Sequence, residues 1–365
     1  MEKAKISGIQ LFAIMFIFEL GTALVVNYGT DAGKDAWLST LLAMSGGVAL
    51  FFIFYFLFRQ YPNLLLTGYI REIFGKYLGW IIGLVYCNHF LYICGRNVRE
   101  FGDLLLSSTL PETPLVVINL TLVLVMCYVI HLGMEVIGRT SEVFIVILFI
   151  FGILGNFFIL VSGDVNFDQI RPFLEHGWKP ILTTSFPHLL VFPFGEMIAF
   201  TMLLPYLNRP KLAKRVWLTA VISSGVIISW TVLLNTAVLG IDVMHRSVFP
   251  TLKAVGKVHL LEFIERLDAI VVFTLLITVF FKASIYLYAA VIGLADLFKL
   301  NTYHQILLPM GVIVIFLSLT MASSFSEQGE EGVFNHYLSI ALLVVIPLLM
   351  LLVSLIRQHF KERIS

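Results

Sequence analysis

The stretch HLLVFPFGEMIAF, from His188 to Phe200, decides how this chain can fold. It lies inside a long apolar segment, yet Pro193, Gly195 and Glu196 stand close together at its middle. Proline lacks a backbone donor and disrupts the preceding turn, glycine weakens a helix, and a carboxylate is costly in hydrocarbon. Backbone groups freed inside a membrane must find partners in the protein or in a water-filled cavity. The stretch therefore predicts a broken membrane helix; a proline kink used only for packing is the alternative.

The composition is that of a membrane protein. Of 365 residues, 59% are hydrophobic and 13% are charged, whereas a soluble protein has about one quarter charged residues. The net charge of +1 gives no basic field for nucleic acid. Cys87, Cys94 and Cys127 all fall in apolar segments, and no metal-ligand spacing or phosphate-binding or nucleophile motif occurs. We therefore expect no metal, no cofactor and no enzymatic activity.

Apolar segments long enough to cross a bilayer recur along the whole chain. A hydrocarbon core of about 30 Å needs about 20 helical residues. The sequence predicts an all-α polytopic membrane protein, with one transmembrane domain over residues 1–365. The ten expected spans are residues 8–28, 37–58, 80–105, 115–133, 141–162, 181–206, 215–240, 268–294, 304–323 and 335–356.

Lysine and arginine predict the orientation of these spans. With the N-terminus inside, the inner segments hold fourteen of the 24 basic residues and the outer segments hold seven. Cytoplasmic loops carry the excess of basic residues. Both termini are therefore expected in the cytoplasm.

Ten spans divide into two halves of five, about 8–162 and 181–356, with opposite orientation in the membrane. The first span carries FELGTALV (Phe18–Val25) and the sixth carries FPFGEMIA (Phe192–Ala199). Each puts a glycine and a glutamate together within apolar sequence. Paired interruptions at corresponding positions of two halves indicate a transporter-type binding site.

The two interruptions predict a site for a small polar molecule. An unwound segment exposes amides and carbonyls, and the half-helix after the break points its positive end at the cavity, which suits a carboxylate. The residues assigned to this site are Gly21, Thr22, Phe192, Pro193, Phe194 and Gly195.

Three further residues place charge inside the membrane, where charged groups are rare and usually functional. Glu19 and Glu196 are expected to be protonated, to pair with a cation or to bind a ligand's amine, near the site or its gate. Lys282 lies too deep in the eighth span to reach the surface, and Tyr286 follows it by one turn on the same face. Lys282 is expected to bind a carboxylate or to replace a coupling ion. The alternative for all three is a fixed structural ion pair or hydrogen bond within the bundle.

The third span contributes further candidates. His89 and Ile93 are four residues apart and share one face near mid-membrane. His89 is expected either to contact a ligand or to be a satisfied core histidine. Arg96 and Arg99 are each followed four residues later by an acid, which favours a structural ion-pair face. Arg96 is also a candidate to border the outer vestibule.

Several motifs together resemble a known family. RPFLEHGWKPIL, FPFGEM followed by PYLNRPKLAKR, FPTLK and FIERLDAIVV occur in an order and spacing that resemble the B subunits of spore nutrient-germinant receptors. That family is similar to amino acid–polyamine–organocation transporters. The stretch HLLEFIERL, inside this region, also predicts a short helix at the outer surface, as a lid, a partner surface or a connector.

The resemblance implies a leucine-transporter-like fold with broken first and sixth helices. It implies a small nutrient ligand, often an amino acid, and a location in the spore inner membrane. It also implies a complex with an A subunit and a C-subunit lipoprotein. By position in the family pattern, the ligand region corresponds to Gly21, His89, Ile93, the segment 192–195, Lys282 and Tyr286.

The site departs from the family pattern. LGTA replaces a GAG-type motif in the first span, and a lysine stands at 282 where a small hydroxyl residue is expected. The identity of the ligand therefore does not carry over, and alanine is a default only. Besides the germinant sensor, a secondary amino-acid transporter, proton-coupled through Glu196 or Lys282, and an ion-channel subunit stay open as alternatives.

Overall fold

The computed structural model describes residues 5–26, 29–257, 268–321 and 336–364. Within these ranges the chain is helical, apart from loops and one isolated bridge between Ile6 and Leu207. The short outer helix expected in HLLEFIERL lies outside the described residues. The chain is an all-helical integral membrane protein, as the composition predicts.

Seven helical segments in the described ranges are long and apolar enough to cross a membrane, and three shorter apolar helices accompany them. All of them coincide with expected spans. The count of ten membrane crossings and the inverted repeat stay predictions. The seven are Thr30–Gln60, Lys76–Ser108, Met134–Val161, Trp178–Met202, Pro210–Leu239, Asp268–Leu297 and His336–His359, and the three are Gly8–Leu24, Leu115–His131 and His304–Thr320.

The α-helices differ in length and are joined by short 3₁₀ and π segments. The α-helices are α1 Gly8–Leu20, α2 Ala36–Gln60, α3 Leu66–Phe74, α4 Lys76–Ser108, α5 Leu115–His131, α6 Met134–Val161, α7 Trp178–Thr183, α8 Ala213–Leu239, α9 Ile241–His245, α10 Pro250–Gly256, α11 Asp268–Leu297, α12 His304–Thr320 and α14 Ile346–Ile364. The segments that matter for the site are η1 Gly21–Leu24, η4 Thr184–Leu189 and η5 Phe194–Met202.

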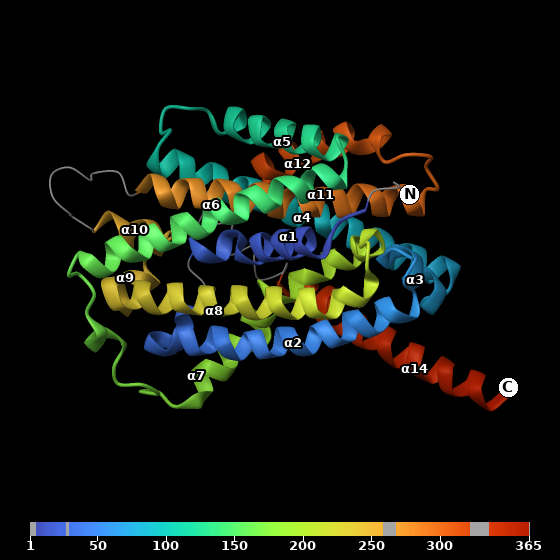
Figure 1. Cartoon of the computed structure of the whole chain (residues 1–365), viewed down its shortest axis with the longest axis horizontal. Helices are drawn as coiled ribbons and strands as arrows, with labels where there is room; N and C mark the ends of the chain where they lie inside the picture. Colours follow the sequence, from blue (N-terminus) through green and yellow to red (C-terminus); the bar gives the residue numbers. More distant parts are fainter. Residues whose placement is uncertain (1–4, 27–28, 258–267, 322–335, 365) are drawn as a thin grey trace.

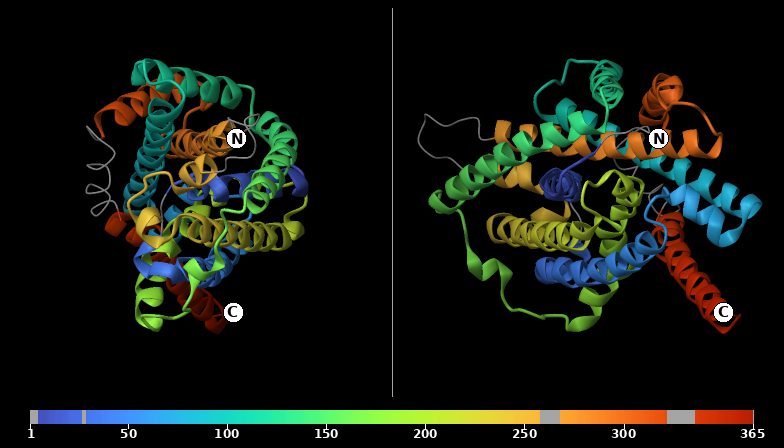
Figure 2. Two further views of the ribbon diagram at one scale, coloured as in Figure 1. Left: turned by 90° about the vertical axis from the view of Figure 1, so that its left-hand side faces the viewer. Right: turned by 45° about the vertical axis from the view of Figure 1, so that its right-hand side comes forward.

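Helix α1 lies at the centre of the bundle and packs against α8, α6 and α11 (Figure 1). Helix α4 packs along α11, and α2 packs along α8. In the right-hand view of Figure 2, α1 is seen nearly end-on, with helices around it. The start of α1 and the end of α14 lie on the same side of the molecule (Figure 1). The central position explains why every residue of α1 from Ala13 to Leu20 is buried, although the helix begins near the chain terminus.

The first span breaks where the sequence predicts. Ser7 and Gln10 form a reciprocal capping box that starts α1. The helix ends at Gly21, whose φ of 38° and ψ of −133° lie in a region that only glycine adopts readily. The Thr278 hydroxyl on α11 donates a 2.8 Å hydrogen bond to the Gly21 carbonyl. The freed backbone is thus partly satisfied by the neighbouring helix.

The sixth span is interrupted twice. The predicted break is present as a turn at Phe192 and Pro193, after which η5 begins at Phe194. A second interruption, which the sequence analysis did not predict, lies at Phe186, with φ −127° and ψ 119°. Proline excludes the helical conformation from the residue before it, and Pro187 follows Phe186. The signal for this interruption was therefore present in the sequence.

Helix α3 is a further element that the sequence analysis missed. It carries a strongly one-sided apolar face and lies against α4, so that Gly79 of α4 touches the backbone at Arg71. Arg71 pairs at 2.6 Å with Asp296, near the end of α11. This pair fastens α3 to the end of the helix that carries Lys282.

Gly21→Ala tests the first break. A Cβ atom at Gly21 would lie 2.6 Å from Cδ of Lys282, and the backbone conformation would be strained. We expect a loss of about 1–3 kcal/mol of stability, measured as a lower thermal unfolding midpoint of the purified protein in detergent. Gly152→Ala, on α6 with nothing within 4 Å of its Cβ position, is the matched control and should not lower the midpoint. Equal midpoints for Gly21→Ala and the wild type would contradict the break.

Candidate functional site

Lys282 lies over the break in the first span. Its side chain is fully buried on α11, and its Cδ and Nζ atoms would lie 2.6 Å and 3.0 Å from a Cβ atom at Gly21. A side chain of any size at position 21 would therefore collide with the lysine. Glycine is needed here both for the backbone conformation and for the close approach of Lys282.

The Lys282 ammonium pairs with Glu196. Its Nζ lies 2.6 Å from Oε2 of Glu196, and both side chains are buried. Glu196 sits in the first turn of η5, where the positive end of a helix favours a carboxylate. The Tyr286 hydroxyl, one turn beyond Lys282, hydrogen-bonds to the same carboxylate. The pair thus joins α11 to η5, the half-helix that follows the break at Phe192 and Pro193.

Aromatic rings enclose this pair. The Lys282 ammonium lies 4.4 Å from the centroid of the Phe192 ring and 5.2 Å from that of Phe18. The Phe18 ring contacts Tyr286 and also Phe200 of η5. Rings attract a cation through their π faces. They also exclude water, so the ion pair lies in a low-dielectric environment.

Glu19, at the end of α1, is buried near the pair without a donor of its own. Its side chain is fully buried, and neither carboxylate oxygen has a hydrogen-bond partner among the described residues. Lys282 and Glu196 are the charged groups that act on it. One ammonium therefore faces two carboxylates. A buried carboxylate without a partner is costly, so it must bind a proton or meet a cation.

The candidate residues of the third span lie in the core of the bundle, and their contact with a ligand stays a prediction. His89 is buried on α4, and its Nδ1 has no partner in the described structure. The ring of its neighbour Phe90 lies 5.9 Å from the Tyr286 ring. Ile93 belongs to the hydrophobic core, and its carbonyl accepts a bond from Asn97. The described residues show no hydrogen bond or ring contact from His89 or Ile93 to Lys282.

The two i,i+4 pairs of α4 form as the spacing indicates. Arg96 pairs with Glu100 at 3.0 Å and Arg99 pairs with Asp103 at 2.9 Å. Arg99 also donates to the carbonyl of Ser318 on α12. The bond to Ser318 links α4 to α12, and a role for Arg96 at a vestibule stays a prediction.

Sequence reasoning missed two residues that shape the site. Thr278 holds the Gly21 carbonyl, and it precedes Lys282 by four residues on the same helix face. Phe18 lies beside Glu19 and contacts both the lysine and Tyr286. Helical spacing from Lys282 would have found Thr278, whereas Phe18 is one of many aromatic residues in apolar sequence and has no such signal.

The sequence of this chain, with its two broken spans and the lysine between them, matches a known protein family. A family profile described as "Spore germination protein" matches residues 5–326. The chain belongs to this spore germination protein family. The resemblance drawn from the sequence motifs is thereby confirmed at the level of the family.

Named relatives cover nearly the full length. "Spore germination protein KB" of Bacillus subtilis (strain 168) is 36% identical over 365 residues, which is all of this chain and 98% of the relative. "Spore germination protein YndE" of the same organism is 25% identical, covering 93% of this chain and 96% of the relative. The family assignment therefore applies to the whole bundle and not to one segment of it.

The fold is that of a transporter. The structure of Mhp1, a nucleobase-cation-symport-1 family transporter in a closed conformation with bromovinylhydantoin bound, is similar with a TM-score of 0.73. The match covers 96% of this chain and 78% of that chain at 16% sequence identity. At this identity the likeness concerns the fold alone.

The buried ion pair makes a prediction about stability. Lys282→Met leaves Glu196 buried without its partner, and Glu196→Gln removes the carboxylate that lies 2.6 Å from Lys282. Breaking such a buried pair costs about 3–5 kcal/mol. The double variant removes both charges and should recover most of that loss, as measured by denaturant or thermal unfolding in detergent.

The Lys34–Glu175 pair offers a matched control. These side chains also pair, at 2.8 Å, but they are partly exposed. The hydrogen bond from Lys34 holds the pKa of the Glu175 carboxyl below its usual range. Solvent screens such pairs, so Lys34→Met is expected to leave the unfolding midpoint nearly unchanged. Strictly additive losses in the Lys282/Glu196 double variant would show that the buried pair does not form.

Proposed function

We propose that this chain is the nutrient-sensing B subunit of a spore germinant receptor, and that Lys282, Glu196 and Glu19 bind a zwitterionic amino acid. In this proposal the chain resides in the spore inner membrane with both termini in the cytoplasm. It reports ligand binding to an A subunit and a C-subunit lipoprotein. The observation that carries the proposal is the closed Lys282–Glu196 pair over Gly21.

The charges of the site suit a zwitterion. One ammonium and two carboxylates are buried together. The Glu19 carboxylate has no hydrogen-bond donor, so it can accept a hydrogen bond from the ammonium group of a ligand. A ligand carboxylate would pair with Lys282, while the ligand ammonium would meet Glu19 or Glu196. Because an amino acid carries no net charge, it enters without adding uncompensated charge to a low-dielectric site. The site therefore favours amino acids over simple anions or sugars.

The same contacts supply a way to signal. Without ligand, Lys282 ties α11 to η5 and lies over the end of α1. A ligand that takes over Lys282 releases Glu196 and allows η5 to move relative to α11. A ligand shifts a conformational equilibrium only by binding one state better than the other. Exchange of the ion-pair partner provides that difference in this site.

A secondary amino-acid transporter is the alternative, and the transporter fold supports it. The two functions share one binding site and differ in whether the ligand crosses the membrane. Proteoliposomes loaded with buffer and given radiolabelled amino acids separate them. Binding without accumulation is expected for the sensor, and concentrative uptake would establish the transporter.

Ligand binding tests the site itself. Purified wild-type protein is expected to bind a radiolabelled amino acid from a panel that begins with L-alanine. Lys282→Met should weaken this binding by about tenfold to a hundredfold, because a charge-assisted hydrogen bond contributes about 1.5–3 kcal/mol. Lys34→Met, which removes a lysine from the surface pair, is the control and should bind as the wild type does.

Glu19→Gln keeps the size of the side chain and removes its charge. We expect it to weaken the binding of amino acids more than that of their deaminated analogues, because the ligand ammonium is the group it would meet. Unchanged affinity in both Lys282→Met and Glu19→Gln would remove the site from this place in the fold.

A further inference from the structure

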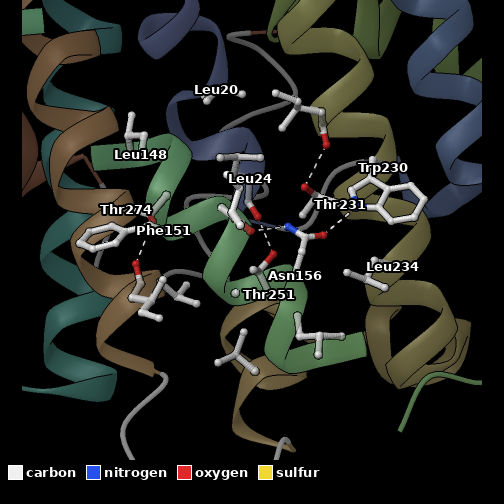
Figure 3. Close-up of a pocket in the computed structure, with 18 of the residues that line it drawn as sticks. Leu20, Leu24, Leu148, Phe151, Asn156, Trp230, Thr231, Leu234, Thr251 and Thr274 are labelled. Atoms are coloured by element: carbon white, nitrogen blue, oxygen red, sulfur yellow. Dashed lines mark hydrogen bonds between the residues drawn. The ribbon is translucent and has the colours of Figure 1, made fainter. Parts of the chain in front are cut away.

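A second cavity is lined by residues on either side of the first break, and Lys282, Glu196 and Tyr286 do not line it (Figure 3). Its volume is about 390 Å³, and it is bounded by α1 with η1, by α6, α8 and α10, and by the start of α11. Its inner wall is formed by Phe16, Leu20 and Leu24, the residues on either side of Gly21. We call it the α6–α8 crevice. It belongs to a different face of α1 from the face that meets Lys282.

The crevice opens toward the surface that faces lipid. Leu20 and Phe16 on its inner wall are buried, whereas Ile153 of α6 and Trp230 of α8 at its mouth are 69% and 43% exposed. Exposed apolar side chains continue along α6 beyond the crevice. In a membrane-spanning bundle, the medium in contact with such a surface is hydrocarbon. Lipid chains therefore stand at the entrance of the crevice.

The lining of the crevice has few hydrogen-bond donors that are free to bind a polar ligand. Each polar side chain in the wall already donates a hydrogen bond to another group of the wall. For example, Trp230 donates to Asn156 at 2.7 Å, and Asn235 donates to Thr251 at 2.8 Å (Figure 3). The donors are Asn156, Trp230, Thr231, Asn235, Thr251 and Thr274. A water molecule needs several polar partners, whereas apolar cavities stay dry and take apolar guests.

Two glycines create the space, and a bridge limits its width. Gly152 and Gly155 line the crevice from α6, and no atom lies within 4 Å of a Cβ built on either. The Trp230–Asn156 hydrogen bond crosses from α8 to α6. A transmembrane helix is about 10 Å wide and would have to break this bridge. A single hydrocarbon chain can pass beside it.

We propose that the α6–α8 crevice binds one acyl chain of a membrane lipid, which packs against Leu20 and Leu24 and supports the backbone at the first break. The bound chain fills a dry space that the protein's own side chains leave open. The state of the surrounding lipid thereby acts on the geometry of Gly21. This lipid site does not depend on the identity of the nutrient.

Photolabelling with a lipid tests the crevice. The full chain is reconstituted in vesicles of phosphatidylethanolamine with phosphatidylglycerol that carries a diazirine in its acyl chain. After illumination, labelled peptides are mapped by mass spectrometry. We expect labels on Leu20, which is buried, and on Leu24, which is partly buried, in addition to labels on the exposed face of α6.

Filling the crevice is the decisive comparison. Gly152→Leu and Gly155→Leu each place a side chain in the open space, and labelling of Leu20 and Leu24 should fall by about tenfold because the guest is displaced sterically. Val146→Leu, at an exposed position on α6 outside the crevice, is the control and should label as the wild type does.

Two results would overturn the proposal. One is wild-type labelling confined to exposed residues, with Leu20 and Leu24 unlabelled. The other is inner-wall labelling that persists in both leucine variants while their unfolding midpoints match that of the wild type. The wild-type measurement alone decides the first point, so a variant that fails to fold does not prevent the test.

Discussion

The buried ion pair between Lys282 and Glu196 is the interaction on which the rest of the site depends. Two charges removed from water are tolerated only if each satisfies the other. Their 2.6 Å contact fixes the middle of α11 against η5, and the lysine stem lies so close to Gly21 that it leaves no room for a side chain there. Three segments that are far apart in the sequence are thereby held in one arrangement.

The membrane explains why these segments are broken at all. A continuous helix satisfies its own backbone and has nothing left to bind a polar guest. At Gly21 and at Phe192–Pro193 the helix is interrupted, and backbone groups lose their partners within the helix. The Thr278 hydroxyl replaces one such partner by donating a hydrogen bond to the Gly21 carbonyl. The loss of these backbone hydrogen bonds is offset because the broken ends lie beside charged side chains in the interior of the bundle, which interact with the exposed backbone dipoles.

Much of this arrangement could be predicted from single residues that are unusual in apolar sequence. Glu196 and Lys282 are conspicuous because hydrocarbon penalises charge, and Gly21 is conspicuous because it stands close to a glutamate in apolar sequence; the structure brings these three together. The alternative of a structural pair for Lys282 is what the described structure shows, and its exchange with a ligand is the added hypothesis.

Other parts of the site and the fold could not be predicted from the sequence in this way. Phe18 and Phe90 contact the site, but they look like any other apolar residues of the spans. Helix α3 is short and lies between spans, so a search for long apolar segments passes over it. The α6–α8 crevice depends on two glycines and on which helices face each other, and this information is tertiary. Only the geometry of the bundle shows that Leu20 and Leu24 line this crevice.

The most direct measurement of the central claim is solid-state NMR of the Lys282 ammonium in lipid bilayers. With ¹⁵N-lysine and ¹³C-glutamate labels, the dipolar coupling between Lys282 Nζ and Glu196 Cδ reports the pair, with Lys282→Met used to assign the signal. On addition of an amino acid labelled with ¹³C at its carboxylate, we expect that coupling to fall and a coupling between Lys282 Nζ and the ligand carboxylate to appear. An unchanged Lys282–Glu196 coupling at saturating ligand would contradict exchange of the ion-pair partner.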